Sequence, residues 1–542
     1  MPRLRPWLIP LVLALGGVIF LLWWLPNRPR NAGPDVPGRK LDSVSYAPYR
    51  PGQSPFTGRF PTAAEVDADL TLLARHVRAI RTYAAIEGDY DVPALAQKYG
   101  LKVWQGIWLG GDRVQNEREM ARAIADANRY PDTIIRVVVG NEVLLRRDLP
   151  VAELIADIDR VRAAVRQPVT YGEVWEFWEQ FPEVARHVDI VSVHLLPYWE
   201  DVPSGIGRAI GHLLAVYRRM AALFPGQKIA IGETGWPSGG RWRADAAPGV
   251  VNQARFIRGF LAVAREQGFD ANVIEAFDQD WKYQSEGTVG AKWGLWTAAR
   301  QEKFPLTGLV VEDRDWAEEA ILSCLLGIGL LIAALSGAPV QAGVQARLAV
   351  LAMTLGGVLG WAVAGTVAAV FDAYSWIAAA GNLAGQTALA LLLMGRARAL
   401  LIGRPVAPRR SGADATAAVR GLLLLRLPRG EWLFDDLSFM FVWAAAVLQL
   451  LLLFDPRYRD FPLPTFAVPV FAVVVRFWLR DLPRGGGGRE DFVAGGVLAV
   501  AAIAGAVREG PLNLQSLAWC ACALVLAAPV LRRCQYGRTG NN

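Results

Sequence analysis

Long apolar runs fill the second half of the chain and separate it from the first half. From Ala317 onward, segments of about 18 to 20 apolar residues recur, the length that a helix needs to cross a bilayer's hydrocarbon core. Between Arg39 and Trp316, by contrast, charged residues are frequent and spread evenly. The overall 53% of hydrophobic residues therefore averages a mildly polar half and a membrane half. We expect a soluble domain at 41–316 and a helical membrane domain at 317–542.

A further apolar run lies near the start of the sequence. Trp7 to Pro26 holds 20 residues after Arg3 and Arg5, whereas the apolar core of a secretion signal has about 7 to 15. No small-residue cleavage motif precedes Asn27, so we expect residues 1–26 to form a retained transmembrane anchor, with a cleaved signal peptide as the alternative. Residues 27–40 are rich in Pro, Gly and Arg, which predicts a linker.

About seven further membrane spans are predicted, and the basic residues between them indicate an orientation. With the N-terminus inside, the loops 396–433 and 480–490 and the C-terminal tail all lie in the cytoplasm. The loop 396–433 alone carries eight arginines, in agreement with the positive-inside rule, although Arg457 and Arg459 fall on the outer side. This topology predicts a multi-pass membrane protein whose soluble domain lies outside the cytoplasm, in the periplasm if the cell has two membranes. The predicted spans are 318–337, 347–368, 376–395, 435–454, 463–479, 491–507 and 514–531.

Charge and cysteine content exclude several classes of function. The net charge of +7 follows from the basic inner loops, so we expect no nucleic-acid partner. The soluble domain has no cysteine, and no cluster of residues has the sequence spacing of metal ligands, so we expect no disulfide, metal or cofactor. No predicted inner loop exceeds about 40 residues, which leaves no room for a cytoplasmic domain that polymerises sugars from sugar nucleotides.

Short apolar strands alternate with amphipathic helices through the soluble domain. Stretches such as 63–80 and 250–268 carry apolar residues at helical spacing. Regular alternation indicates a parallel sheet, and eight repeats in this length indicate a closed barrel. The predicted fold class is therefore α/β, a (β/α)8 TIM barrel plus an α-helical transmembrane domain. The predicted strands are 43–49, 79–85, 101–109, 134–141, 168–174, 189–197, 227–234 and 272–279.

Two glutamates stand at the ends of predicted strands four and seven, Glu142 in VVVGNEVLLR and Glu233 in IAIGETGWPSGG. These strands face each other across the barrel mouth, so the two carboxylates can flank one sugar bond. A separation of about 5 to 5.5 Å would favour a retaining mechanism, with one carboxylate as nucleophile and the other as acid. In this arrangement Asn141 is placed to form a hydrogen bond with the sugar's 2-hydroxyl. The alternative is that each glutamate only caps the next helix.

The same motifs resemble glycoside hydrolase family 17, the β-1,3-glucanase family of (β/α)8 barrels. The resemblance rests on VVVGNEV, IGETGWPS and FDQDWKYQSEGTVGAKWGLW at 277–296, and it covers residues 41–300. It implies that Glu142 is the general acid/base and Glu233 the nucleophile. The substrate-binding residues that we expect from it are Asn141, Arg81, Tyr83, His194, Tyr198, Trp199, Trp236, Gln279 and Lys282.

Two positions depart from the pattern of the plant members, which usually have a carboxylate where Gln279 stands and an asparagine near His194. The arrangement looks more like bacterial membrane-bound members linked to cyclic β-glucan and β-1,6-glucan synthesis, several of which are glucanosyltransferases. The resemblance implies a β-glucan oligosaccharide or polysaccharide as substrate, water or a sugar as acceptor, and membrane lipid and a glucan synthase as partners. A non-catalytic glucan-binding or export module is the rival hypothesis, and it would predict the loss of a catalytic glutamate.

Two sets of side chains keep alternative interpretations. His194 could orient a catalytic carboxylate or be an ordinary residue of the barrel wall. Trp175, Trp178 and Trp199 follow predicted strands five and six, where they could stack on an acceptor sugar or belong to the core.

Overall fold

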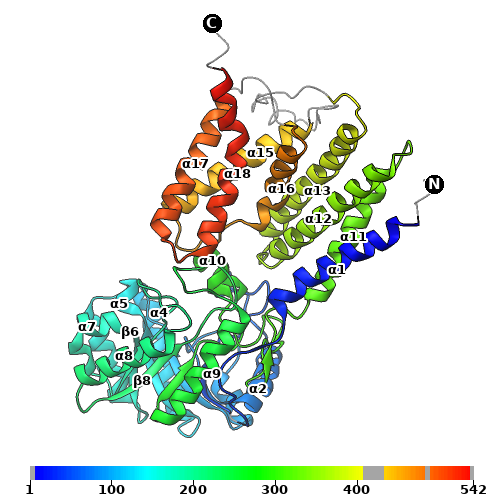
Figure 1. The fold of residues 1–542 in the computed structure, drawn as a ribbon. Helices are drawn as coiled ribbons and strands as arrows, with labels where there is room; N and C mark the ends of the chain where they lie inside the picture. Colours follow the sequence, from blue (N-terminus) through cyan, green and yellow to red (C-terminus); the bar gives the residue numbers. More distant parts are fainter. Residues whose placement is uncertain (1–5, 39, 407–432, 482–488, 538–542) are drawn as a thin grey trace. The chain divides into compact units, whose positions relative to one another are not determined.

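The computed structural model describes residues 6–38, 40–406, 433–481 and 489–537. Two compact units are present: Pro29–Val311 forms one, and Met1–Arg28 together with Glu312–Asn542 forms the other (Figure 1). Five of the eight arginines in the loop 396–433 and Arg484 in the loop 480–490 lie outside the described residues. The orientation that these loops indicate stays a prediction from sequence.

Eight parallel strands close a barrel in the first unit, and the predicted fold class is confirmed. Each strand pairs with the next along the chain, and the last pairs with the first through Ser43–Asn272 and Val44–Val273. Barrel strands one to eight are β2 (Leu41–Ser45), β3 (Val77–Arg81), β4 (Lys102–Ile107), β5 (Ile134–Asn141), β6 (Val169–Val174), β7 (Ile190–His194), β8 (Lys228–Thr234) and β9 (Asp270–Val273).

Several predicted strands run past the observed ones at their C-terminal ends. The first ends at Ser45, not at residue 49, and the last ends at Val273, not at residue 279. The apolar pattern continues because the loops beyond these ends are buried as well. Tyr46 and Phe277 are both 0% exposed and pack edge to face at 6.2 Å. Periodicity alone does not separate a buried loop from the strand before it.

Helices cover the outside of the barrel and begin and end at recognisable signals. Thr62 and Glu65 form a capping box at the start of α2 (Ala63–His76), and Gly268 ends α9 (Val250–Gln267) in a left-handed conformation. The other helical segments of this unit are α3 (Val92–Lys98), α4 (Arg113–Arg129), α5 (Val143–Arg146), α6 (Val151–Ala164), α7 (Trp175–Gln180), η1 (Pro182–Arg186), α8 (Ala209–Leu223), η2 (Asp280–Lys282) and α10 (Tyr283–Ala291). A short antiparallel pair joins the two ends of the unit, β1 (Arg30–Asn31) to β10 (Leu309–Val310).

The second unit is helical. Within the described residues, seven helices are long and apolar enough to cross a membrane. They are α1 (Leu8–Asn27), α11 (Trp316–Leu335), α12 (Ala342–Val367), α13 (Ala373–Leu401), α15 (Leu433–Phe454), α17 (Arg489–Glu509) and α18 (Leu514–Gly537).

The predicted span 463–479 differs from these. It contains a 3-10 turn, η3 (Pro464–Phe466), followed by α16 (Ala467–Trp478), a helix of 12 residues. At 1.5 Å per residue such a helix covers about 18 Å, less than the hydrocarbon core of about 30 Å.

Small residues let α11 and α12 pack closely. A Cβ atom on Gly327 would come within 3.0 Å of the Met353 backbone, so a larger side chain has no room there. Ser323 accepts a hydrogen bond from the Trp23 indole of α1 at 3.0 Å, which ties the N-terminal helix to the same group.

Candidate active site

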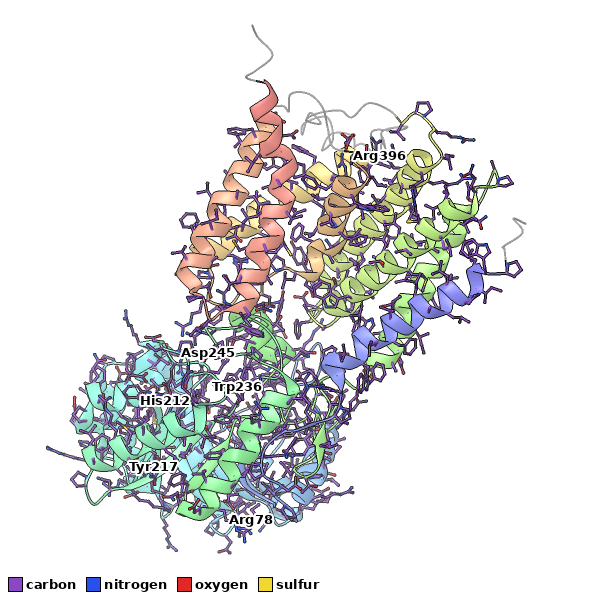
Figure 2. All side chains as sticks on the ribbon, in the orientation of Figure 1. Arg78, His212, Tyr217, Trp236, Asp245 and Arg396 are labelled. Carbon is purple, nitrogen blue, oxygen red and sulfur yellow. The ribbon has the colours of Figure 1, made fainter. Side chains whose placement is uncertain are left out.

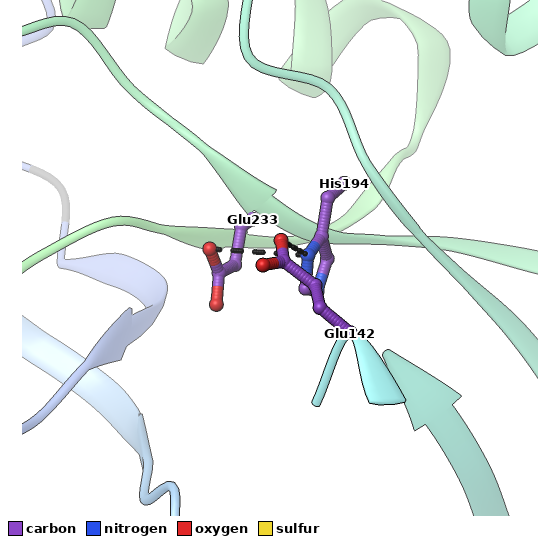
Figure 3. Close-up of side chains that lie close together, drawn as sticks. All are labelled: Glu142, His194 and Glu233. Carbon is purple, nitrogen blue, oxygen red and sulfur yellow. Dashed lines mark hydrogen bonds and ion pairs between the residues drawn. The ribbon is translucent and has the colours of Figure 1, made fainter. Parts of the chain in front are cut away.

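Two carboxylates and a histidine meet at the C-terminal ends of three barrel strands (Figure 3). Glu142 follows β5 directly, Glu233 is the next-to-last residue of β8, and His194 ends β7. Nδ1 of His194 is 2.7 Å from Oε1 of Glu142 and 3.9 Å from Oε2 of Glu233. The structure thus brings together the two glutamates that the sequence places on strands four and seven, and it sets His194 between them.

Glu142 stands at a bend in the backbone. Its φ of 53° is left-handed, a conformation that residues other than Gly, Asn and Asp seldom adopt. It occupies the N-cap position of α5, yet its side chain makes no capping hydrogen bond. The hypothesis that this glutamate merely caps the following helix is therefore wrong.

Arg81 connects the second glutamate to the residue before the first. Its Nη1 donates a short hydrogen bond to Oε1 of Glu233, and its Nη2 donates to Oδ1 of Asn141 at 2.5 Å. The Tyr83 hydroxyl donates to the same Glu233 oxygen at 3.0 Å. With Oδ1 engaged by Arg81, the Nδ2 group of Asn141 is the donor that this amide can offer to a ligand.

Glu233 is only 4% exposed, and its surroundings favour the ionised form. Burial by itself would raise the pKa of this carboxyl. The electrostatic interactions with His194, Arg81 and Lys282, together with the Arg81 hydrogen bond, outweigh burial. The pKa of Glu233 is therefore lowered.

Lys282 reaches this site from η2 through a third carboxylate. Its Nζ lies 3.0 and 2.9 Å from the two oxygens of Glu275, a glutamate that is 0% exposed. Burial raises the pKa of Glu275 to about 7, although the Lys282 charge opposes that shift. The pKa of Lys282 is raised, because the charges of Glu275 and Glu286 outweigh the effect of burial. Lys282 thus remains a cation, and its charge acts on both Glu275 and Glu233.

Glycines on the neighbouring strands make room for His194 and Arg81. A Cβ atom on Gly172 of β6 would stand 2.9 Å from Nε2 of His194 and 2.9 Å from Nη2 of Arg81. One on Gly232 of β8 would stand 2.9 Å from Cδ2 of His194. Any side chain at these positions would displace the imidazole from its place between the carboxylates.

The sequence around this site is similar to those of known proteins. The BtgE/BtgC glycoside hydrolase domain family matches residues 43–294. A glucan 1,3-beta-glucosidase of Schizosaccharomyces pombe is 30% identical over 255 residues, which cover 44% of this chain and 79% of the relative. The chain belongs to the family 17-like β-1,3-glucanases.

The chain is also similar to a further relative and to two solved structures. A glucan 1,3-beta-glucosidase of Arthroderma benhamiae is 28% identical over 283 residues, covering 48% of this chain and 89% of the relative. The glycoside hydrolase family 17 β-1,3-glucanosyltransferase from Rhizomucor miehei has a TM-score of 0.42 at 24% identity, covering 48% of this chain and 95% of that one. An active-site mutant of that Rhizomucor miehei enzyme in complex with laminaritriose has a TM-score of 0.43 at 22% identity, covering 50% and 98%.

Three of the expected substrate-binding residues are not where a sugar could touch them. Tyr198, Trp236 (Figure 2) and Gln279 are each 0% exposed. The Tyr198 hydroxyl and the Trp236 indole donate to the backbone oxygens of Arg241 and Ala247, and the two rings pack on each other at 5.7 Å. The prediction that these three side chains contact a sugar directly is corrected, because the side chains are buried and support the loops from the inside.

Gln279 has an indirect part in the site. Its Oε1 accepts a hydrogen bond from the Trp281 indole at 2.8 Å, and its Nε2 donates to Ala47 O at 2.9 Å. The Phe56 ring, 78% exposed, packs against Trp281 at 5.4 Å. No sequence pattern singles out Phe56, because it lies in a loop that has no periodicity.

The tryptophans of the rim divide in the same way. Trp178 is 1% exposed and packs against Tyr171, so its proposed stacking on an acceptor is corrected. Trp199 and Trp175 are half-buried, and Arg243 and Arg219 lie over their rings at 6.0 and 5.0 Å. Both remain candidates for contact with a sugar.

The three central residues also lie close enough together to be considered as metal ligands, a grouping that sequence spacing does not reveal. Each residue offers one possible ligand atom, and the three atoms, from Glu142, His194 and Glu233, lie within 4.8 Å of one another. These atoms already have partners, since His194 faces Glu142 while Arg81 and Tyr83 donate to Glu233. A cation here would stand beside the Arg81 guanidinium, so hydrogen bonding accounts for the cluster better than a metal does.

We predict that replacing Arg81 shifts the pH dependence of the enzyme. In Arg81→Met the Glu233 carboxylate loses a charge and a hydrogen bond that lower its pKa, so that pKa rises. The acid limb of the kcat/KM profile should move to higher pH, and the maximum should fall by about 10²-fold or more because Glu233 and Asn141 lose their shared anchor. Arg78→Met, on the same strand but with a 61% exposed side chain (Figure 2), is the control and should change neither. An unshifted acid limb in Arg81→Met would contradict this account.

Proposed function

We propose that this protein is a membrane-embedded, retaining β-1,3-glucan-active enzyme that transfers glucan chains outside the cytoplasm. The observation that carries the proposal is the pair of carboxylates from opposite sides of the barrel, with oxygens within 4.8 Å of each other. Retaining glycosidases place their carboxyl groups about 5 to 5.5 Å apart, whereas inverting enzymes leave about 6.5 to 9.5 Å for a water.

Glu233 has the environment of the nucleophile. Its lowered pKa keeps it ionised at neutral pH. Arg81 and Tyr83 both donate to Oε1, which leaves Oε2 as the attacking oxygen. In the first step Oε2 bonds to the anomeric carbon as the bond from that carbon to the leaving oxygen breaks.

Glu142 has the environment of the acid and base. Its side chain is 22% exposed, so it can reach both the leaving oxygen and an incoming acceptor. It gives its proton to the leaving oxygen in the first step. In the second step it takes a proton from the acceptor hydroxyl, which attacks the anomeric carbon and releases Glu233. His194, at 2.7 Å, orients Glu142 in both steps.

The acceptor decides whether the reaction is hydrolysis or transfer, since water and a sugar compete for the same glycosyl-enzyme. The half-buried rings of Trp175 and Trp199 follow strands five and six, and strand five pairs with the strand that carries Glu142. A sugar stacked there would lie close to the base, which favours transfer to a sugar hydroxyl. The relatives named glucan 1,3-beta-glucosidase support a β-1,3-glucan donor, and a new β-1,6 link is the form of transfer that we propose.

Seven long apolar helices in the described residues support the membrane embedding. The basic loops of the sequence support a cytoplasmic N-terminus and a barrel on the opposite side of the inner membrane. A glucan synthase that delivers the donor chain, and the lipid around the helices, are the partners that this placement favours.

Chemical rescue tests the assignment of the two glutamates. Glu233→Ala should lose turnover of β-1,3-gluco-oligosaccharides, and with an activated aryl glycoside added azide should yield the α-glycosyl azide by direct attack. Glu142→Ala should still cleave aryl glycosides with good leaving groups, and azide should give the β-glycosyl azide from the covalent intermediate. Mass spectrometry and NMR identify the products. Wild-type activity in either variant would remove that glutamate from the mechanism.

Product analysis tests the acceptor. The full-length protein in detergent, given laminari-oligosaccharides of one length, should yield products both shorter and longer than the substrate, with any β-1,6 link visible by NMR. Trp175→Ala should shift products toward hydrolysis while cleavage persists, because a weakened acceptor site leaves the intermediate to water. Trp281→Ala, beyond strand eight on the other side of Glu233, serves as comparison and should slow both reactions alike. Only shorter products from the wild type would identify a plain glucanase.

Reporter fusions test the orientation. A fusion after Gly403 should report the cytoplasm, because it lies within the arginine-rich loop 396–433. A fusion after Lys40 should report the opposite side. The reverse pattern would refute the extracytoplasmic barrel.

A further inference from the structure

We infer that Glu173, together with Tyr171, is a positioning residue that aims the general acid Glu142 at the leaving oxygen. This inference rests on the proposed role of Glu142 and adds to it two residues of the neighbouring strand. Neither side chain touches the substrate space, since Glu173 is 0% and Tyr171 1% exposed. They act on Glu142 through the backbone that follows it.

The backbone around Glu142 makes two left-handed bends. Gly140 has a φ of 83° and Glu142 a φ of 53°, and the pairing of β5 with β6 shifts register between Val138 and Asn141. A left-handed conformation is unfavourable for a residue that has a Cβ atom. Such a bend persists only where neighbouring contacts hold it.

Those contacts come from β6. The first turn of α5 presents the amides of Leu144 and Leu145, which an N-cap side chain would normally satisfy. Here Leu144 N–H donates to the Tyr171 hydroxyl at 3.1 Å, and Leu145 N–H donates to Oε2 of Glu173 at 3.3 Å. The capping of α5 is thus supplied by the neighbouring strand, and the carboxylate of Glu142 is available to His194.

The two capping side chains are themselves fixed. The Tyr171 hydroxyl donates a short hydrogen bond to Oε2 of Glu173, and Val174 N–H donates to Oε1 at 2.9 Å. The Tyr171 ring packs edge to face on the buried Trp178 at 5.6 Å. The Tyr171 hydroxyl and the amides of Leu145 and Val174 all donate to the Glu173 carboxyl, which matches a carboxylate acceptor. A movable surface contact would not define the direction of Glu142 in this way.

The charges of the two glutamates also interact. Burial raises the pKa of Glu173 to about 7, and the charge of Glu142 is the next largest cause.

A simpler interpretation is that Glu173 only stabilises the fold. The two interpretations predict a different dependence of the reaction rate on the leaving group. A misdirected acid slows bonds whose leaving group needs a proton and spares aryl glycosides whose leaving group departs without one. A general loss of stability lowers both rates by the same factor.

The test compares full-length variants on a laminari-oligosaccharide and on a dinitrophenyl β-laminaribioside. Glu173→Ala should lower kcat/KM for the oligosaccharide by about 10²-fold and leave that for the aryl glycoside almost unchanged. Tyr171→Phe should show the same pattern to a smaller degree. Glu173→Gln should restore most of the activity, because its amide oxygen can still accept from Tyr171 and Leu145.

Glu119→Ala is the matched control. Glu119 is also a glutamate with 2% exposure that accepts three backbone N–H bonds, from Ala85, Ile86 and Trp108. It should lose thermal stability with no dependence on the leaving group. If Glu173→Ala does not fold, Tyr171→Phe still decides the question.

Equal losses on both substrates, or no loss on either, would overturn the positioning role of Glu173. That result would leave the proposed function intact, which depends on the separate behaviour of Glu142→Ala and Glu233→Ala.

Discussion

The guanidinium of Arg81 is the contact on which the arrangement of the site depends. It is 1% exposed, and its two terminal nitrogens hold Glu233 and Asn141 at once. A buried cation is costly unless it is paired and hydrogen-bonded. Here the ion pair with Glu233 and the hydrogen bond to Asn141 offset that cost. The same two contacts keep one carboxylate ionised and turn the neighbouring amide toward the position of a sugar hydroxyl. A lysine could not do both, because its ammonium lacks the planar fork.

Around this contact the barrel gives each strand a separate task. Strand two supplies Arg81, strand four Asn141 and Glu142, strand six His194 and strand seven Glu233. Strand five has supporting tasks: its Gly172 leaves the space for His194, and its Tyr171 and Glu173 cap α5. Residues that only shape or hold the others are as specific in position as those that carry the chemistry.

The sequence predicts the barrel and its two glutamates because both depend on short-range patterns. Alternating strands and helices count to eight, and a glutamate directly after a strand has one possible location in such a barrel. The buried aromatic residues were harder to place. Tyr198, Trp199 and Trp236 occupy similar loop contexts, but only Trp199 is more than slightly exposed. Whether the ring of a loop residue faces the core or the solvent depends on tertiary packing. The local sequence pattern does not show that packing.

Glu173 shows the same limit from the opposite direction. In the sequence it is one acidic residue within VTYGEVWEF, with no motif around it. Its importance comes from the amides of α5, about thirty residues earlier in the chain, and from the left-handed turn at Glu142, which a pattern of residue types does not reveal. Likewise, the grouping of Glu142, His194 and Glu233 joins three strands far apart in sequence.

The most direct test of the account is to trap the glycosyl-enzyme. A laminaribioside with fluorine in place of the 2-hydroxyl and fluoride as leaving group slows both steps, and the second one more. The adduct should therefore accumulate on the full-length protein. Peptide mapping by mass spectrometry should then find the sugar on Glu233, with no adduct in Glu233→Ala. A sugar attached to another residue, or inactivation without any covalent adduct, would contradict the double displacement on which the account rests.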